Sequence, residues 1–165
     1  HVAALARRPM EIQAFEHQVA FNCLPQVGAF QADSGGRFSG EIRAMEQVRR
    51  VLGLADLPLS VTRVRVPVLN GHGLAVNVEL DRAAAPVAVR GLYDGMDGME
   101  VVDEPEGAEY PMPLEASGRD EVLIGRIRRD PSVDNGLDLW LSLDNVRVGG
   151  ALNLVGTLRR WLPDS

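Results

Sequence analysis

Two side chains near the middle of the chain could do polar chemistry: His72, which lies between two glycines, and Arg65, a few residues before it. An imidazole titrates near neutral pH and is the usual general acid and base in enzymes. A guanidinium suits two-pronged binding of a carboxylate or a phosphate. The alternatives are an exposed loop histidine without a role and an arginine in a cross-strand ion pair. The residues by themselves leave both pairs of readings open.

Arg43 is a third candidate, because it lies in the first turns of a predicted helix. A cation beside the partial positive charge of a helix N-terminus does not stabilise that helix. Its position would be tolerated if an anion bound nearby, since helix N-termini also attract phosphate. The alternative is an ordinary solvated arginine.

The segments 61–68 and 74–80 both alternate apolar and polar residues, which predicts two amphipathic strands joined by a turn. With that turn centred on Gly71, the alternation places Arg63 near Glu79 as an ion pair. Arg65, on the same predicted strand, then lacks an acidic neighbour and is the better anion binder.

The elements around this hairpin predict the fold class. Apolar residues at helical spacing, followed by Gly53 at the stop position, predict a helix over 40–52. Further predicted elements are helices over 82–93 and 149–162 and strands over 98–103, 122–128 and 137–143. Strands and helices segregate without a βαβ rhythm, so we expect an α+β domain: a mostly antiparallel or mixed sheet with helices packed on one face. A single domain is expected over residues 1–165.

Other chemistry finds little support in the sequence. Cys23 lies in a short apolar run closed by proline, so we expect a small buried hydrophobe and not a nucleophile. Three histidines and one cysteine show no ligand spacing, and no metal site is predicted. Neither glycine-rich phosphate-binding motif occurs, so any dinucleotide-binding fold is expected outside this chain.

Composition bounds the class of protein. The 165 residues include 17 Lys+Arg and 23 Asp+Glu, which gives a net charge of −6 and argues against non-specific nucleic-acid binding. No apolar run approaches the length of a membrane span. The single cysteine excludes an intrachain disulfide framework and fits a cytoplasmic protein. The chain begins at His1, without a methionine, so we expect a piece of a longer protein.

Several stretches, taken together and in order, resemble one family. They are 19–27, which reads VAFNCLPQV; 63–73, which reads RVRVPVLNGHG; 110–114, which reads YPMPL; 125–130, which reads GRIRRD; 135–140, which reads NGLDLW; and 144–153, which reads DNVRVGGALN. Their order and spacing resemble the carboxy-terminal half of aspartate-β-semialdehyde dehydrogenase along nearly the whole chain. The resemblance also implies a fold similar to the C-terminal domain of glyceraldehyde-3-phosphate dehydrogenase.

The resemblance implies an NADP-dependent enzyme of amino-acid biosynthesis, which makes lysine, methionine, threonine and diaminopimelate precursors. It converts aspartyl phosphate to aspartate semialdehyde through a cysteine thioester, with release of phosphate. That cysteine and most of the NADP site would lie upstream of His1, so the fragment by itself is expected to be inactive. His72 matches the acid/base histidine, Arg65 the arginine that binds the substrate carboxylate, and Arg43 a phosphate-binding lysine. A homodimer, with Arg126 and Arg128 on the face that associates, is also implied.

Two departures from the family pattern are visible. The family commonly has glutamate three residues before the lysine, where this chain has Gly40 followed by Glu41. We predict Glu41 as a further substrate-binding residue. Arginine at 43 replaces a compact ammonium with a planar fork, which changes how phosphate is held. These departures motivate an alternative, a non-catalytic dimeric paralogue. A related N-acylglutamyl-phosphate reductase is a second alternative.

Overall fold

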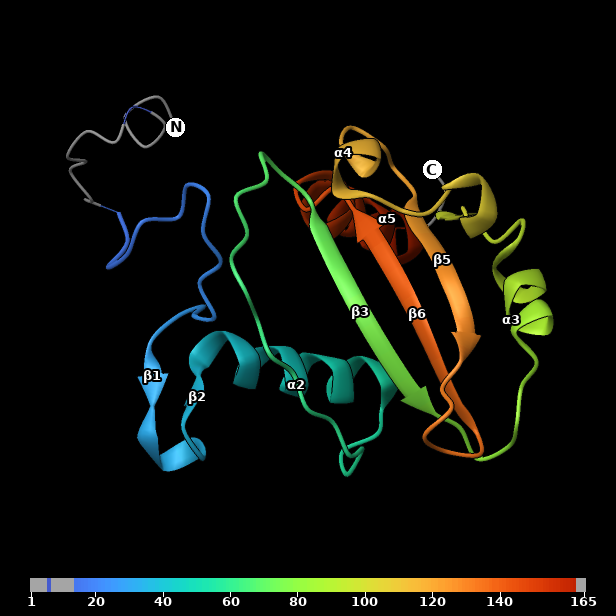
Figure 1. Cartoon of the computed structure of the whole chain (residues 1–165), viewed down its shortest axis with the longest axis horizontal. Helices are drawn as coiled ribbons and strands as arrows, with labels where there is room; N and C mark the ends of the chain where they lie inside the picture. Colours follow the sequence, from blue (N-terminus) through green and yellow to red (C-terminus); the bar gives the residue numbers. More distant parts are fainter. Residues whose placement is uncertain (1–5, 7–13, 163–165) are drawn as a thin grey trace. The chain divides into compact units, whose positions relative to one another are not determined.

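The computed structural model describes residue 6 and residues 14–162. The chain forms two compact units, residues 1–67 and residues 68–165, which are described separately (Figure 1). The expectation of one domain over residues 1–165 stays a prediction.

The first unit is built around helix α2, Ser39–Leu52. Two short strands, β1 (Phe30–Gln31) and β2 (Arg37–Phe38), form an antiparallel pair immediately before it. The predicted helix over 40–52 is confirmed. Gly53 ends the helix in the left-handed conformation with φ 68°, where glycine carries no steric penalty.

The segment 61–68, predicted as a strand, is not one. It forms a single isolated antiparallel bridge, in which Arg65 exchanges backbone hydrogen bonds with Leu24 at 2.8 and 3.0 Å. The apolar run around Leu24 is therefore a connector that pairs at one residue. Alternation of apolar residues predicts an extended backbone but does not supply a ladder partner.

The second unit contains a four-stranded sheet in the order β3–β6–β5–β4. The strands are β3 (His72–Glu79), β4 (Met99–Val101), β5 (Val122–Arg129) and β6 (Gly136–Leu143). The central strand β6 pairs antiparallel with β3 and β5, whereas β4 pairs parallel with β5. The α+β class with a mixed, mostly antiparallel sheet is confirmed. The predicted hairpin of 61–68 with 74–80 is wrong, because 61–68 is not a strand and its backbone bridge is to Leu24.

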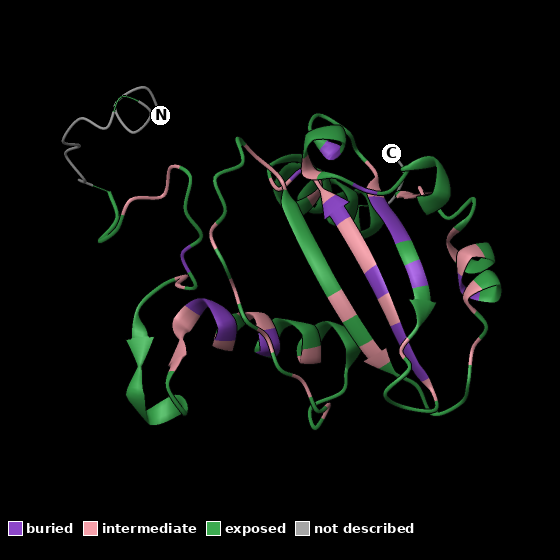
Figure 2. Cartoon of the chain, viewed as in Figure 1, coloured by how far each residue is buried: buried purple, intermediate pink, exposed green. Residues whose placement is uncertain are grey.

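Helix α3 (Pro86–Tyr93) covers one face of this sheet, and the core lies between them. Its buried residues come from three elements: Val89, Ile124, Ile127, Leu137 and Leu139. Figure 2 shows that burial is concentrated on β5 and β6, while β3 at the edge is mostly exposed.

Two further helices complete the second unit. A short helix α4 (Pro113–Ala116) contacts β6. The predicted C-terminal helix consists of a π-helical turn (Arg147–Ala151) and helix α5 (Leu152–Trp161). Within the described part of the chain, no helix is long and apolar enough to cross a membrane.

Strand β5 carries a β-bulge between Gly125 and Arg128, which shifts its register against β6. Arg126 lies in the bulge with φ 55°, a conformation that costs a non-glycine residue free energy. The Asp103 carboxylate holds this geometry, because it accepts hydrogen bonds from the N–H groups of Arg126 (2.6 Å) and Ile127 (3.2 Å). Arg90 on α3 closes the cluster with an ion pair to Asp103 at 2.5 Å. A buried carboxylate thus stabilises the irregularity by pairing the bulge N–H groups that the ladder leaves unpaired.

Candidate functional site

His72 is the first residue of β3, opposite Leu143 in the ladder with β6. Its side chain is exposed. The strand begins there because Gly71, with φ 91°, turns the chain out of the extended conformation. The expected loop before His72 is therefore present, and the histidine occupies the junction between loop and sheet.

The turn after β6 touches this loop. Asn145 accepts a hydrogen bond from the backbone N–H of Gly71 at 2.6 Å, and Asp144 accepts one from the side-chain amide of Asn70 at 3.3 Å. Asp144 is buried and its pKa is lowered, because the backbone N–H groups of Arg147, Gly118 and Val146 donate to the charged form.

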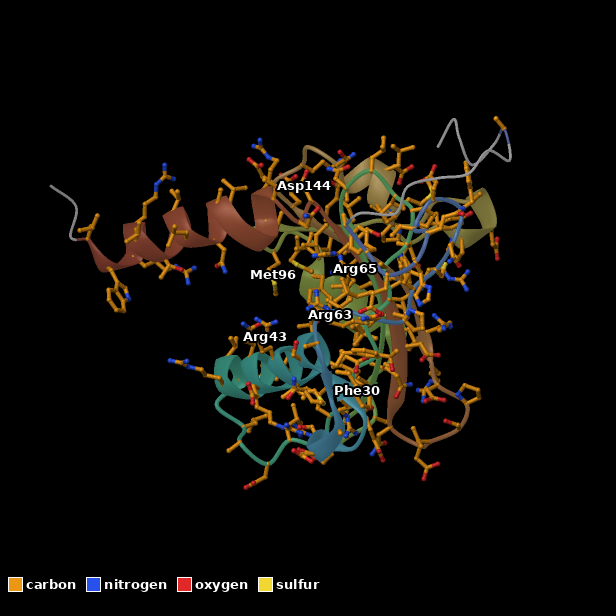
Figure 3. The ribbon with its side chains drawn as sticks, turned by 90° about the vertical axis from the view of Figure 1, so that its left-hand side faces the viewer. Phe30, Arg43, Arg63, Arg65, Met96 and Asp144 are labelled. Atoms are coloured by element: carbon orange, nitrogen blue, oxygen red, sulfur yellow. The ribbon has the colours of Figure 1, made fainter. Side chains whose placement is uncertain are left out.

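Arg65 belongs to the first unit and is half-buried. Its guanidinium carbon lies 4.9 Å from the centre of the Phe15 ring, a cation–π contact that orients the group without neutralising it. Its backbone is tied to Leu24. Among the described residues Arg65 makes no ion pair, so no described carboxylate neutralises its charge. Figure 3 labels it together with Arg43 and Arg63.

The predicted ion pair of Arg63 with Glu79 stays a prediction, because the two residues belong to different units. The guanidinium of Arg63 donates to the carbonyl of Gly40 at 3.4 Å, and the backbone N–H of the same residue donates to the Glu41 carboxylate at 3.1 Å. The hairpin from which this ion pair was inferred is not formed, because 61–68 is not a strand.

Glu41 is buried in the first turn of α2 and has a structural task. One carboxylate oxygen accepts the N–H of Phe38 at 3.0 Å, and the other accepts the N–H of Arg63. These two bonds, with the Phe38 bond as the larger cause, lower the pKa of Glu41. A role in substrate binding stays a prediction, and any substrate group would compete with two backbone donors.

Gly40, the first departure from the family pattern, is explained by close packing. A Cβ atom placed there would lie 2.5 Å from the carbonyl oxygen of Val27, to which the Gly40 N–H donates at 2.9 Å. No side chain fits without movement of that backbone, so a glutamate at this position is incompatible with the observed packing.

Arg43, the second departure, is exposed on α2. Its Nε donates to the carbonyl of Ser39 at 3.3 Å, one turn earlier. The guanidinium makes no ion pair within the described residues, so most of its donors face solvent. An anion near the start of α2 could reach them.

Cys23 departs from expectation, since it is exposed and not buried. The next residue in the run, Leu24, is the buried one. The described residues contain no cluster of three histidine, cysteine or acidic side chains able to hold a metal.

The chain is similar to known proteins of one family. Residues 2–148 match the family described as "Semialdehyde dehydrogenase, dimerisation domain". The chain belongs to this family. This semialdehyde dehydrogenase domain is 38% identical over 143 residues to the aspartate-semialdehyde dehydrogenase of Aquifex aeolicus, and 36% identical over 148 residues to that of Bacillus subtilis. These matches take in 87% and 89% of the chain but 42% of each relative.

Solved structures agree with the sequence relatives. The domain superposes with a TM-score of 0.89 and 34% identity on aspartate semialdehyde dehydrogenase II of Vibrio cholerae complexed with ASA, over 96% of this chain and 46% of that one. A probable aspartate-semialdehyde dehydrogenase of Pseudomonas aeruginosa gives 0.86 and 36%, over 98% of this chain and 48% of that one. The chain therefore spans less than half the length of its relatives.

The sequence did not predict the structural roles of Asp103, Asp144 and Asn145, whose side chains accept hydrogen bonds from the β5 bulge and from the loop before His72. An Asp-Asn pair directly after a strand is a recognisable turn signal, and it could have marked 144–145. Its long-range partner, the loop before His72, has no local signature.

Proposed function

We propose that this domain is the C-terminal part of an NADP-dependent aspartate-semialdehyde dehydrogenase, which converts L-aspartyl 4-phosphate to aspartate semialdehyde with release of phosphate. The observation that carries the proposal is the match of nearly the whole chain to relatives of that name. The similar Vibrio cholerae structure holds ASA, which fits a small acidic substrate.

In this proposal His72 is the general acid and base. It takes the proton from the nucleophilic thiol of the upstream cysteine, and later returns a proton to the departing group. Its exposure at a loop–strand junction leaves the ring accessible to such a partner. A pKa near neutrality lets imidazole act in both directions at physiological pH.

Arg65 is proposed to bind the substrate carboxylate, and Arg43 the phosphate. Both guanidinium groups lack ion pairs among the described residues, and a fixed cation binds an anion more strongly when no internal carboxylate competes. Phe15 restricts the orientation of Arg65, which lowers the entropy lost on binding. Glu41, in the first turn of α2, is proposed as a further substrate-binding residue.

NADP is proposed to bind mainly outside this chain. Among the described residues, no glycine-rich turn joins a strand to a helix N-terminus, and such a turn commonly holds a dinucleotide pyrophosphate, which supports this proposal. NADP is therefore assigned to the part of the protein outside this chain, and the 165 residues by themselves are proposed to be inactive. A homodimer and a cytoplasmic location complete the proposal.

The test uses the full-length protein that contains this chain. We expect phosphate-dependent reduction of NADP⁺ with aspartate semialdehyde, followed at the absorbance of NADPH. His72→Ala should lower kcat by about 10²-fold, as expected for loss of general acid/base catalysis. The matched control is His17→Ala, because His17 is also exposed and has no assigned role. An inactive full-length protein, or equal activity in both variants, would reject the proposal.

A second candidate, a non-catalytic dimeric paralogue, is favoured by one observation. The packing of Gly40 against Val27 excludes the glutamate that the family commonly has there. This candidate predicts that the upstream sequence lacks the nucleophilic cysteine or the nucleotide-binding glycines. A substrate panel that includes N-acylglutamyl phosphate separates the remaining alternative.

A further inference from the structure

The antiparallel ladder of β3 and β6 ends at the pair His72–Leu143. One residue further, Gly71 has φ 91° and leaves the strand. A Cβ atom at Gly71 would lie 3.2 Å from the carbonyl oxygen of Leu143 and 3.3 Å from that of Pro113, so the turn is tightly enclosed. Because Gly71 lies outside the strand, the ladder hydrogen bonds with β6 do not hold the backbone before His72.

The side chain of Asn145 takes over where the ladder stops. Its amide oxygen accepts the Gly71 N–H at 2.6 Å, in place of a strand carbonyl. Asn145 is half-buried, which limits the ability of water to replace this bond. His72 is thus held on one side by the ladder and on the other by a side chain from the turn after β6.

Asp144 adds a second tie to the same loop. Its carboxylate receives the amide of Asn70 at 3.3 Å, and Asn70 also donates to Ser117 at 2.9 Å. The carboxylate is itself fixed by the N–H groups of Gly118, Val146 and Arg147, at 2.8, 2.8 and 2.9 Å. A buried acceptor with three backbone donors is a rigid anchor.

We propose that Asn145 is a positioning residue for His72, acting through its hydrogen bond to Gly71, with Asp144 holding the neighbouring Asn70. This inference rests on the proposed function, since it assigns Asn145 to the reaction through the general acid/base. A proton-transfer group misplaced by about 1 Å can lose about 10²-fold in rate. Loosening one of two ties should cost less than removing the imidazole.

The experiment compares Asn145→Ala with the conservative Asn145→Asp in the full-length protein. The aspartate keeps an oxygen acceptor for the Gly71 N–H, whereas alanine has none. We expect Asn145→Ala to lower kcat about 10-fold with KM changed less than about 2-fold, and Asn145→Asp to recover most of the loss. In ¹⁵N-histidine spectra, assigned with His72→Ala, the His72 imidazole signals should shift or broaden in Asn145→Ala and return toward wild type in Asn145→Asp.

The matched control is Asn77→Ala. Asn77 lies on the same strand and donates two side-chain hydrogen bonds, to Asp130 at 2.6 Å and Asp138 at 2.9 Å. We expect it to lower the melting temperature while leaving kcat and the His72 signals unchanged. Any general loss of stability is thereby separated from positioning.

Unchanged His72 signals in Asn145→Ala would overturn the inference, as would a kcat loss matched by Asn77→Ala. The proposed function fails separately, if His72→Ala itself retains full activity. In that case the histidine spectra still decide whether Asn145 positions the imidazole.

Discussion

Replacing Asp103 with alanine is expected to lower the free energy of unfolding of this domain by about 3 kcal/mol. The Asp103 side chain is 2% exposed and accepts from two bulge N–H groups and from Arg90. Alanine removes all three acceptor contacts, and the bulge in β5 has no other described partner for these N–H groups.

The magnitude follows from how well water can replace each contact. The Ile127 N–H belongs to a residue that is 1% exposed, so leaving it unpaired costs about 1–3 kcal/mol. The Arg90 side chain is 37% exposed, so water substitutes for much of its ion pair, at a cost of about 0–1 kcal/mol. Arg126 is exposed and its N–H adds a smaller amount. The midpoints of these ranges, together with the Arg126 contribution, add to about 3 kcal/mol.

The assay is urea unfolding followed by far-ultraviolet circular dichroism, with thermal unfolding alongside. At this chain length each kcal/mol shifts the melting temperature by about 2–4 °C, so we expect a fall of roughly 5–15 °C. Asp103→Asn keeps one oxygen acceptor but turns an amide toward the second donor, and should lose an intermediate amount. The control is Asp81→Ala, at an exposed aspartate. Equal unfolding curves for Asp103→Ala and Asp81→Ala would refute the reasoning.

Three further outcomes are expected. Arg126→Gly should raise the free energy of unfolding by about 1 kcal/mol, because glycine adopts φ 55° without strain, whereas Arg129→Gly in the same strand should lower it; the same urea assay decides. Since the folded-state pKa of Asp144 is lowered, its stabilising contribution is full above the ordinary aspartate pKa of about 4 and is lost as pH falls through the folded value. Asp144→Asn should therefore flatten the loss of stability below about pH 5, and an unchanged pH profile would contradict this. Arg65→Lys in the full-length protein should raise KM for aspartate semialdehyde about 10-fold or more with a smaller change in kcat; steady-state kinetics with unaltered constants would exclude carboxylate binding by Arg65.

Local patterns predicted those elements whose geometry depends on their own residues. The helix at Ser39–Leu52 and its stop at Gly53 follow from 3.6-residue spacing and a glycine able to take positive φ. Strands β5 and β6 and helix α3 were also found at nearly the predicted positions. Each prediction needed only a regular pattern and a terminating residue.

Pairing could not be predicted in the same way. The segment 61–68 alternates as clearly as β3 does, yet it pairs at one residue with Leu24, while β3 pairs along its whole length with β6. A period of two residues states which side chains share a face, but any strand with a matching face can supply the ladder. The ion pair predicted for Arg63 had been inferred from a hairpin that does not form.

For the candidate site, residue type and order by themselves named His72, Arg65 and Arg43, and also placed the chain in its family. Tertiary structure decided what surrounds them. It gave Glu41 two backbone donors, exposed Cys23, and brought Asn145 to the loop before His72. These contacts join positions more than twenty residues apart in the case of Glu41 with Arg63, and seventy-four in the case of Gly71 with Asn145. A chain's own periodicity carries no information about such partners, because they are chosen by which buried donors and acceptors the packed elements leave unpaired.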